Sequence, residues 1–282
     1  MPISTISGLI AVLLYLTAYF LQSRQLSLGS ESAGRNQRQQ SPSETQTHTS
    51  NRTVMILGLL AVLAHGWSAY HLIYASDGYH FGIVQISTLI SASMSLLVIL
   101  SSYNKPLGNL ILGLFPLAIL CIILSLSIES RFPAQTITSG IATHILLSIL
   151  AYSFFTIAAL QAAFLAFQNH QLKHHHLASV IKRFPPLQDM ENFLFQLLWT
   201  GQILLSLGIV VGFLFVDDIW AEGLLHKTFF SLLAWLVFAV LLGGRHQLGW
   251  RGKTAIRGTL SGFSLLILGF YGSKFVLEYI LS

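Results

Sequence analysis

Charged side chains are scarce in this chain of 282 residues: Asp, Glu, Lys and Arg make up 9% of it, against roughly a quarter in soluble domains. Hydrophobic residues make up 54%. The formal net charge of +5 comes from only fifteen basic and ten acidic residues, which is too sparse for a nucleic-acid-binding surface. We therefore expect no nucleic-acid partner and predict a protein whose solvent is the lipid bilayer.

Cysteine is almost absent, because the chain holds only Cys121 and that residue lies inside an apolar run. Disulfides, cysteine-based zinc sites and a CxxCH haem attachment are thereby excluded within the chain. The motifs GxGxxG, GxxxxGK[ST], HExxH and GxSxG are missing too. Any metal or haem site must use other ligands, and a binding protein is favoured over an enzyme.

Long apolar runs dominate what is present. A bilayer core of about 30 Å requires about 20 apolar residues in a helix. Eight runs approach or exceed this length: 3–22, 54–74, 83–103, 109–128, 141–167, 193–215, 228–243 and 256–280. The predicted fold class is therefore all-α, a polytopic membrane protein with about eight transmembrane helices.

The first run could also be read as a signal peptide, but it lacks a basic n-region and a clear cleavage site. We expect 1–22 to be a retained transmembrane helix. Residues 23–52 are almost devoid of apolar side chains and predict a disordered cytoplasmic linker. The other seven helices, in 53–282, are expected to form the bundle.

Arg and Lys are distributed unevenly between the connections. Those after the first, fifth and seventh runs hold at least three each, and those after the second, fourth and sixth hold one or none. Basic loops remain in the cytoplasm. This asymmetry predicts both termini on the outer side, which is the periplasm if the membrane is a bacterial inner membrane.

Two histidines lie within apolar runs, where an ionisable side chain is a functional candidate. His65 lies past the midplane of the second run, and His144 lies about one turn from the outer end of the fifth. Both are expected in the outer half of the bundle. Ser148 and Tyr152 follow His144 at four-residue intervals, which predicts one polar stripe on an otherwise apolar helix.

Each histidine allows two interpretations. A neutral imidazole can simply pack inside the bundle, or it can ligate haem iron, for which an apolar helix bundle is a suitable pocket. His144 and His65 are the candidate iron ligands. His71 and His226 lie at outer helix ends, where they could provide a second ligand or belong to the solvated interface. The His174–His176 run lies in a basic loop and is interpreted as solvated rather than metal-binding.

The C-terminal part, LLAWLVFAVLLGGRHQLGWRGKTAIRGTLSGFSLLILGFYGSKFV, resembles the end of the cytochrome c assembly family, the haem-handling membrane proteins of the CcsA and CcmC type. A helix there is followed by a basic turn, Gly-Trp-Arg-Gly and a last helix rich in Gly and aromatics. The matching residues are Arg245, Gly249, Trp250, Arg251, Gly252, Gly262, Phe263 and Gly272. His144, followed by Tyr152 two turns later, resembles the external haem-ligating histidine of the family.

The chain also departs from the family pattern. The Trp-rich external signature WGxxWxWD is reduced to Trp220, with Lys227 at the place of its final lysine. Only one of the two external histidines is matched. This reduced pattern resembles the YpjD-like branch of inner-membrane proteins, so the resemblance implies haem binding without cytochrome c synthase activity.

The sequence thus predicts a haem-binding or haem-handling inner-membrane protein that holds haem in its periplasmic half through His144. His65, His226 or His71 could lie opposite, and Tyr152 lies beside the site. Haem, the bilayer and cytochrome c biogenesis or other membrane proteins are the expected partners. Two alternatives remain. One is a small-solute or ion transporter, suggested by Gln85, Gln196 and Gln202 within the runs. The other is a haem-less membrane scaffold.

Overall fold

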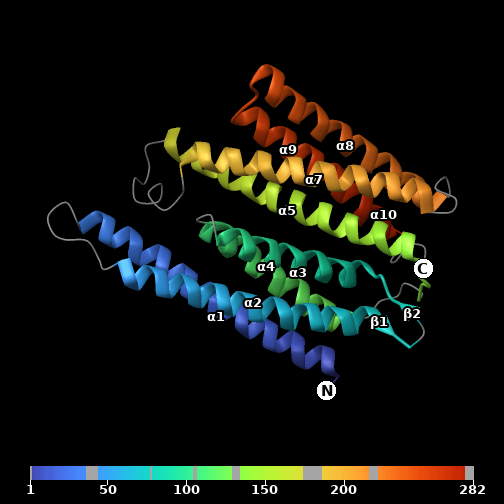
Figure 1. Cartoon of the computed structure of the whole chain (residues 1–282), viewed down its shortest axis with the longest axis horizontal. Coiled ribbons are helices and arrows are strands. Elements are labelled where there is room, and N and C mark those ends of the chain that lie inside the picture. Colours follow the sequence, from blue (N-terminus) through green and yellow to red (C-terminus); the bar gives the residue numbers. More distant parts are fainter. Residues whose placement is uncertain are drawn as a thin grey trace.

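The computed structural model describes residues 2–35, 44–76, 78–103, 107–128, 134–173, 186–215 and 222–276. Within these ranges the chain is almost entirely helical (Figure 1). The elements, labelled as in Figure 1, are α1 (Ile3–Arg35), α2 (Glu44–Ile73), β1 (Tyr74–Ala75), β2 (Gly78–Tyr79), α3 (Ile83–Ser102), α4 (Gly108–Ser127), α5 (Ser139–Lys173), α7 (Leu187–Phe215), α8 (Glu222–Leu248), α9 (Lys253–Ile267), the π-helical turn η1 (Leu268–Gly272) and α10 (Ser273–Phe275). Eight segments are long and apolar enough to cross a membrane, which confirms the predicted polytopic all-α class.

The helices run side by side along one axis, as a membrane-spanning bundle requires (Figure 1). One end carries the β1–β2 hairpin, the start of α1 and the start of α5, and we call it the hairpin end. The other end carries the connection between α8 and α9, and we call it the Arg245 end. Large apolar side chains such as Leu63, Trp199 and Leu236 are exposed along the sides of the bundle, where lipid tails replace water.

Two groups of helices make up the bundle. Helices α1 to α4 pack on one another, and α5, α7, α8 and α9 form the second group. Helix α3 packs against α5 and joins the groups. The hydroxyls of Ser87 on α3 and Tyr271 on η1 add a hydrogen bond of 3.0 Å across this junction.

The first helix differs from expectation. The sequence predicted a bundle of the other seven helices, but α1 packs into the bundle as well. It contacts α2 and α4, and its Tyr15 side chain is fully buried. A Cβ atom added at Gly8 would lie 2.9 Å from Leu126 and 3.0 Å from Ser68, so the missing side chain permits this close approach. The hydroxyl of Ser68 then donates a 2.7 Å hydrogen bond to the Ser4 carbonyl.

The segment expected to be a disordered linker, 23–52, is shorter in the structure. Helix α1 continues to Arg35 and α2 begins at Glu44, while 36–43 lies outside the described residues. No proline interrupts the chain between Pro2 and Pro42, so polar residues continue each helix beyond its apolar part. Polarity ends a membrane span, but it does not by itself end a helix.

At the Arg245 end, Glu191 on α7 organises the turn between α8 and α9. Its carboxylate accepts hydrogen bonds from Arg245 at 2.9 Å, Arg251 at 3.2 Å and the Gly252 amide at 3.1 Å. The Trp250 ring covers Gly244, where any Cβ would overlap the indole. The Gly-Trp-Arg-Gly turn is therefore a junction of three helices around one carboxylate.

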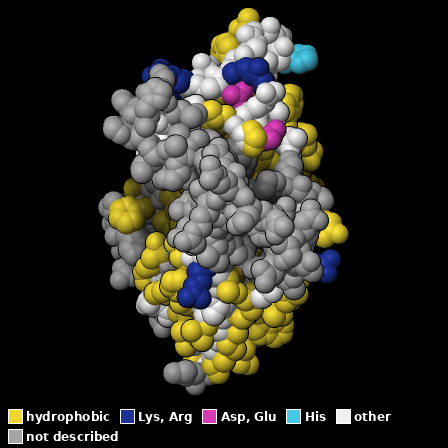
Figure 2. Space-filling view, turned by 90° about the vertical axis from the view of Figure 1, so that its left-hand side faces the viewer, with side chains coloured by type: hydrophobic (Ala, Val, Ile, Leu, Met, Phe, Trp, Pro, Cys, Tyr) yellow, Lys and Arg dark blue, Asp and Glu magenta, His cyan; other side chains and the backbone are white. Residues whose placement is uncertain are grey.

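Figure 2 views the molecule from the Arg245 end. Lys and Arg side chains lie at separate places on this end face, together with some Asp or Glu side chains, and apolar side chains cover the part below it. The arrangement agrees with the uneven distribution of basic residues in the sequence.

Candidate ligand cavity at the hairpin end

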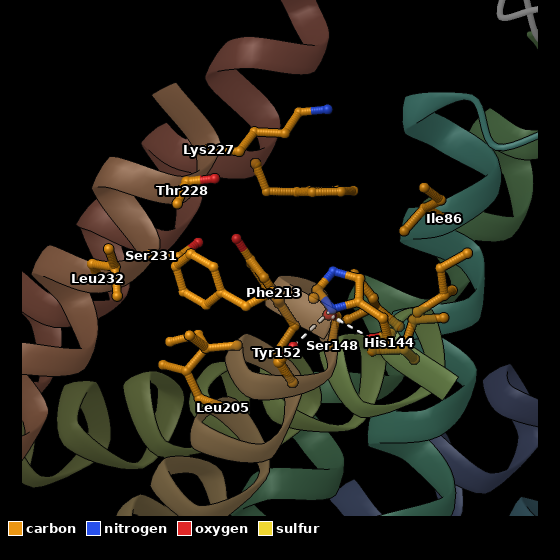
Figure 3. Close-up of a pocket in the computed structure, with 17 residues that line it drawn as sticks. Ile86, His144, Ser148, Tyr152, Leu205, Phe213, Lys227, Thr228, Ser231 and Leu232 are labelled. Atoms are coloured by element: carbon orange, nitrogen blue, oxygen red, sulfur yellow. Dashed lines mark hydrogen bonds between the residues drawn. The ribbon is translucent and has the colours of Figure 1, made fainter. Parts of the chain in front are cut away.

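A cavity of about 320 Å³ lies between α3, α5, α7, α8 and η1, near the hairpin end (Figure 3). Most of its wall is apolar. The polar lining residues are His144, Ser148, Tyr152, Lys227, Thr228 and Ser231. Its volume is in the range of small-molecule sites, and an apolar wall with a few convergent polar groups is typical of them.

His144 lies in the second turn of α5 and lines this cavity. Its Nδ1 atom lies 2.8 Å from the carbonyl oxygen of Gly208 on α7. A carbonyl oxygen only accepts, so Nδ1 carries the proton and donates, which leaves the lone pair of the neutral ring on Nε2. Figure 3 shows the second ring nitrogen on the side of the ring away from this bond. An imidazole fixed in this way has the tautomer that metal-ligating histidines use.

Two glycines of α7 make room for the imidazole. A Cβ atom added at Gly212 would lie 2.9 Å from Cε1 and 3.0 Å from Nδ1 of His144, which is too close. One turn earlier, a Cβ at Gly208 would meet Leu147 at an ordinary 3.7 Å. The position of the ring therefore depends on Gly212, while Gly208 contributes its carbonyl.

The polar stripe of α5 faces the cavity along its whole length. The Ser148 hydroxyl donates to the His144 carbonyl at 2.8 Å. Tyr152, one turn deeper, donates at 2.6 Å to the carbonyl of Leu266. That carbonyl would ordinarily accept from the amide four residues later, Phe270, which lies in the π-helical turn η1. The Tyr152 hydroxyl thus bonds to the Leu266 carbonyl oxygen at the point where α9 passes into the π-helical turn η1. Phe270 of this turn lines the cavity.

The opposite wall is formed by α8 (Figure 3). Lys227, Thr228 and Ser231 lie on the face of this helix that lines the cavity. Lys227 is partly buried, and in the part of the chain that the structure describes it makes no hydrogen bond or ion pair. No Asp or Glu is among the lining residues that the structure describes.

The structure does not bring His65 to the same place. Its side chain is fully buried between α1, α2 and α4, and it does not line the cavity. Its Nδ1 shares a 3.3 Å hydrogen bond with the Tyr15 hydroxyl, and the two rings meet edge to face at 5.8 Å. Nε2 has no partner among the described residues. His65 is thus enclosed against Tyr15 of α1 and does not share a cavity with His144.

The other candidate histidines also lie apart from His144. His71 is exposed at the end of α2 and packs edge to face on Trp67, with ring centroids 5.0 Å apart. His226 is exposed on α8, and neither residue lines the cavity. Within the described ranges, no three His, Cys, Asp or Glu residues gather as a metal site. Trp220 and His174–His176 lie outside the described residues.

Several residues of these sites escaped the sequence reasoning. Ser231 follows Lys227 at i+4, so helical spacing could have placed it beside the lysine. Glu191 and Tyr15 carry no such local signal, because their partners are 54 and 50 residues away in the chain. Gly208 and Gly212 are four residues apart in an apolar run. This spacing indicates that another helix packs closely there, but it does not identify His144 as the neighbouring residue.

The chemistry of the lining residues suits a haem with one protein ligand. Its wall is apolar, His144 offers an uncommitted Nε2, and Tyr152 and Ser148 hold the surrounding backbone. Among the described residues, no second histidine lines the cavity. The described residues of the site would therefore provide a single imidazole ligand, that of His144.

Fold and cavity together define a multi-pass α-helical membrane protein with a histidine-bearing ligand cavity close to one face of the bilayer. The sequence model of the family described as cytochrome C assembly protein matches residues 53–281. This match covers most of the chain, so the protein belongs to that family.

Individual relatives agree with this assignment. The chain is 29% identical to the inner membrane protein YpjD of Escherichia coli over 237 residues, which cover 81% of this chain and 88% of YpjD. It is 22% identical to the cytochrome c biogenesis protein CcsA of Prochlorococcus marinus over 206 residues, 64% of this chain and 66% of CcsA. The protein HemX of Brevibacillus brevis is 24% identical over 132 residues, 46% of this chain and 48% of HemX. No solved structure matches the chain significantly.

Proposed function

We propose that this protein binds or handles haem in a bacterial inner membrane and acts in cytochrome c biogenesis or a related haem pathway. In this proposal the hairpin end faces the periplasm, and His144 ligates the iron through Nε2. Haem, the bilayer and other membrane proteins of the pathway are the partners. The role is that of a binder, not an enzyme.

The observation that carries the proposal is the fixed tautomer of His144. A hydrogen bond from Nδ1 to a backbone carbonyl leaves Nε2 available toward an apolar cavity, which is the arrangement of a metal-binding imidazole. Tyr152 and Ser148 support the helix backbone behind the ring. When bound, haem would contribute a redox-active iron and a visible chromophore, and the chain would contribute orientation and exclusion of water.

The periplasmic placement rests on charge. Basic side chains are present at the Arg245 end (Figure 2), and basic ends of membrane proteins remain in the cytoplasm. The hairpin end, with the cavity and the start of α1, would then face outward. The membrane assignment itself is supported by YpjD, which is described as an inner membrane protein.

The polar residues that suggested a transporter have structural partners. The amide of Gln85 donates to the Ile128 carbonyl at 3.1 Å, and that of Gln202 donates to the Trp235 carbonyl at 3.3 Å. Both bonds join one helix to the end or side of another, so these residues link helices instead of lining a path.

The proposal is tested by purifying the protein in detergent, adding haemin and recording the absorption spectrum. Wild-type protein should give a Soret band with a shifted maximum. His144→Ala should weaken haem affinity by at least the about 10-fold to 100-fold that is typical for loss of a partner of a metal ligand. His226→Ala is the matched control, because this histidine is exposed at the same end and does not line the cavity. A wild-type protein that takes up no haemin would overturn the proposal and favour the scaffold alternative.

A further inference from the structure

The lysine of the cavity is unusual for its position in a membrane helix. Lys227 is the third residue of the apolar span Leu225–Leu248 and faces the cavity from α8. An ammonium group within a span is costly unless it reaches water or an anion. Among the described residues it has no hydrogen bond and no ion pair.

The lining residues give the cavity an asymmetric chemistry. Among the described residues that line the cavity, Lys227 is the only one with a formal charge, and none is Asp or Glu. Ser231 lies one turn along the same helix face, and Thr228 is adjacent (Figure 3). The Lys227 ammonium is a cationic donor, and the Ser231 hydroxyl on the same wall is a further donor. Donors of this kind match an oxyanion.

The rest of the wall is apolar. Ile86 and Ile90 come from α3, Leu205 comes from α7, and Phe270 comes from η1. These side chains would exclude a small hydrated anion, because they offer it no hydrogen bonds. A ligand complementary to the whole cavity has an apolar body and one anionic end directed toward α8.

We propose that Lys227, with Ser231 on the same helix face, binds a carboxylate of such an amphipathic ligand. The inference rests on the proposed function in one respect: if the ligand is haem, the group bound is a propionate of the porphyrin. A fatty acid shares the chemistry of a carboxylate on an apolar body. The lysine is then a specificity-determining residue that is separate from the iron ligand, His144.

The test uses porphyrins without iron, so that it does not depend on His144. Full-length protein in detergent is titrated with protoporphyrin IX and with its dimethyl ester, and porphyrin fluorescence is followed. Wild-type protein should bind the diacid about tenfold more tightly than the ester, as one charge-assisted hydrogen bond implies. Lys227→Gln should remove this preference by weakening the diacid alone, and Lys227→Arg should preserve most of it.

His226→Gln is the matched control, because it changes the adjacent residue of α8 without altering the lining of the cavity. A second arm measures displacement of a fluorescent fatty acid by palmitate and by hexadecanol. If neither porphyrin binds but palmitate competes better than the alcohol only when Lys227 is present, the carboxylate site is supported and haem is not its ligand. If Lys227→Gln alters neither the porphyrin nor the palmitate preference, the inference is wrong and the lysine extends to the interface instead.

Conversely, His144→Ala could leave the haem spectrum unchanged while the diacid preference still depends on Lys227. This outcome would contradict the proposed function and support the carboxylate site. The two claims therefore fail in different experiments.

Discussion

At the scale of single residues, two histidines in apolar helices have different surroundings. His65 is enclosed by α1 and shares its Nδ1 with Tyr15. His144 gives its Nδ1 proton to a carbonyl and turns toward a cavity. The sequence identified both residues because each is ionisable within a span, but that signal does not distinguish a packed imidazole from an available one. The polar stripe of Ser148 and Tyr152 behind His144 does distinguish the two histidines, because all three residues of the stripe line the same cavity.

The dependence of His144 on Gly212 gives a test that leaves the histidine intact. Gly212→Ala places a methyl group against the imidazole, so the ring must shift and lose its bond to Gly208. Haem affinity should fall by about tenfold or more, as for other losses of ligand orientation. Gly208→Ala is the matched substitution, and its new methyl group meets only ordinary contacts. Equal affinities in the two variants, measured by haemin titration, would contradict the geometry described.

The pairing of Tyr15 with His65 predicts a contribution to stability and none to the ligand. Tyr15→Phe removes one hydrogen bond within the bundle and should cost about 0.6–1 kcal/mol. His65→Ala also leaves a void and should cost about 2–3 kcal/mol. Thermal unfolding in detergent measures both, and haemin titration should give wild-type affinity. Loss of haem binding in His65→Ala would instead place this residue at the iron.

At the scale of helices and turns, hydropathy predicted where the spans lie, because the thickness of the bilayer sets their length. It could not predict the ends of α1 and α2, which continue as polar helix beyond the span. It could not predict η1 either. The π turn is stabilised by Tyr152, which reaches the Leu266 carbonyl from 114 residues away, and no local pattern encodes that contact.

The contacts of Glu191 at the α8–α9 turn predict that its loss destabilises the protein. Its side chain is 13% exposed and balances Arg245, so Glu191→Ala leaves a guanidinium without its carboxylate. The expected cost is about 3 kcal/mol, the lower end for breaking a buried pair. Arg251 is 56% exposed, and Arg251→Ala should cost no more than about 1 kcal/mol. Denaturation in detergent compares the two, and a larger loss for Arg251→Ala would contradict this ranking.

At the scale of the whole molecule, the bundle joins two helix groups through α3, and the cavity lies beside this junction on the hairpin side. The sequence predicted the number of spans. The segment 53–282, in which it predicted seven helices, is also the part that the family model matches, over residues 53–281. It did not predict that α1 completes the first group, since a helix with a uniform apolar surface shows no preferred face. The cavity itself depends on five elements and appears only when they pack.

Orientation in the membrane is predicted from charge and is directly measurable. Cysteine labels introduced at positions 40, 178 and 248 should be accessible only from the cytoplasm, and labels at 78, 135 and 220 only from the periplasm. Replacing Cys121 with Ala first removes the one native thiol. Labelling of position 178 from the periplasm would reverse the orientation and place the cavity on the cytoplasmic side.

The central claim is that Nε2 of His144 binds haem iron, and restoring the ligand from solution tests it most directly. His144→Gly removes the imidazole and leaves space for a free one at the same place. The haem-loaded variant should lose the wild-type spectrum and regain it when imidazole is added, while wild-type protein should respond little to the same concentrations. A His144→Gly spectrum identical to wild type, before any imidazole is added, would contradict the account.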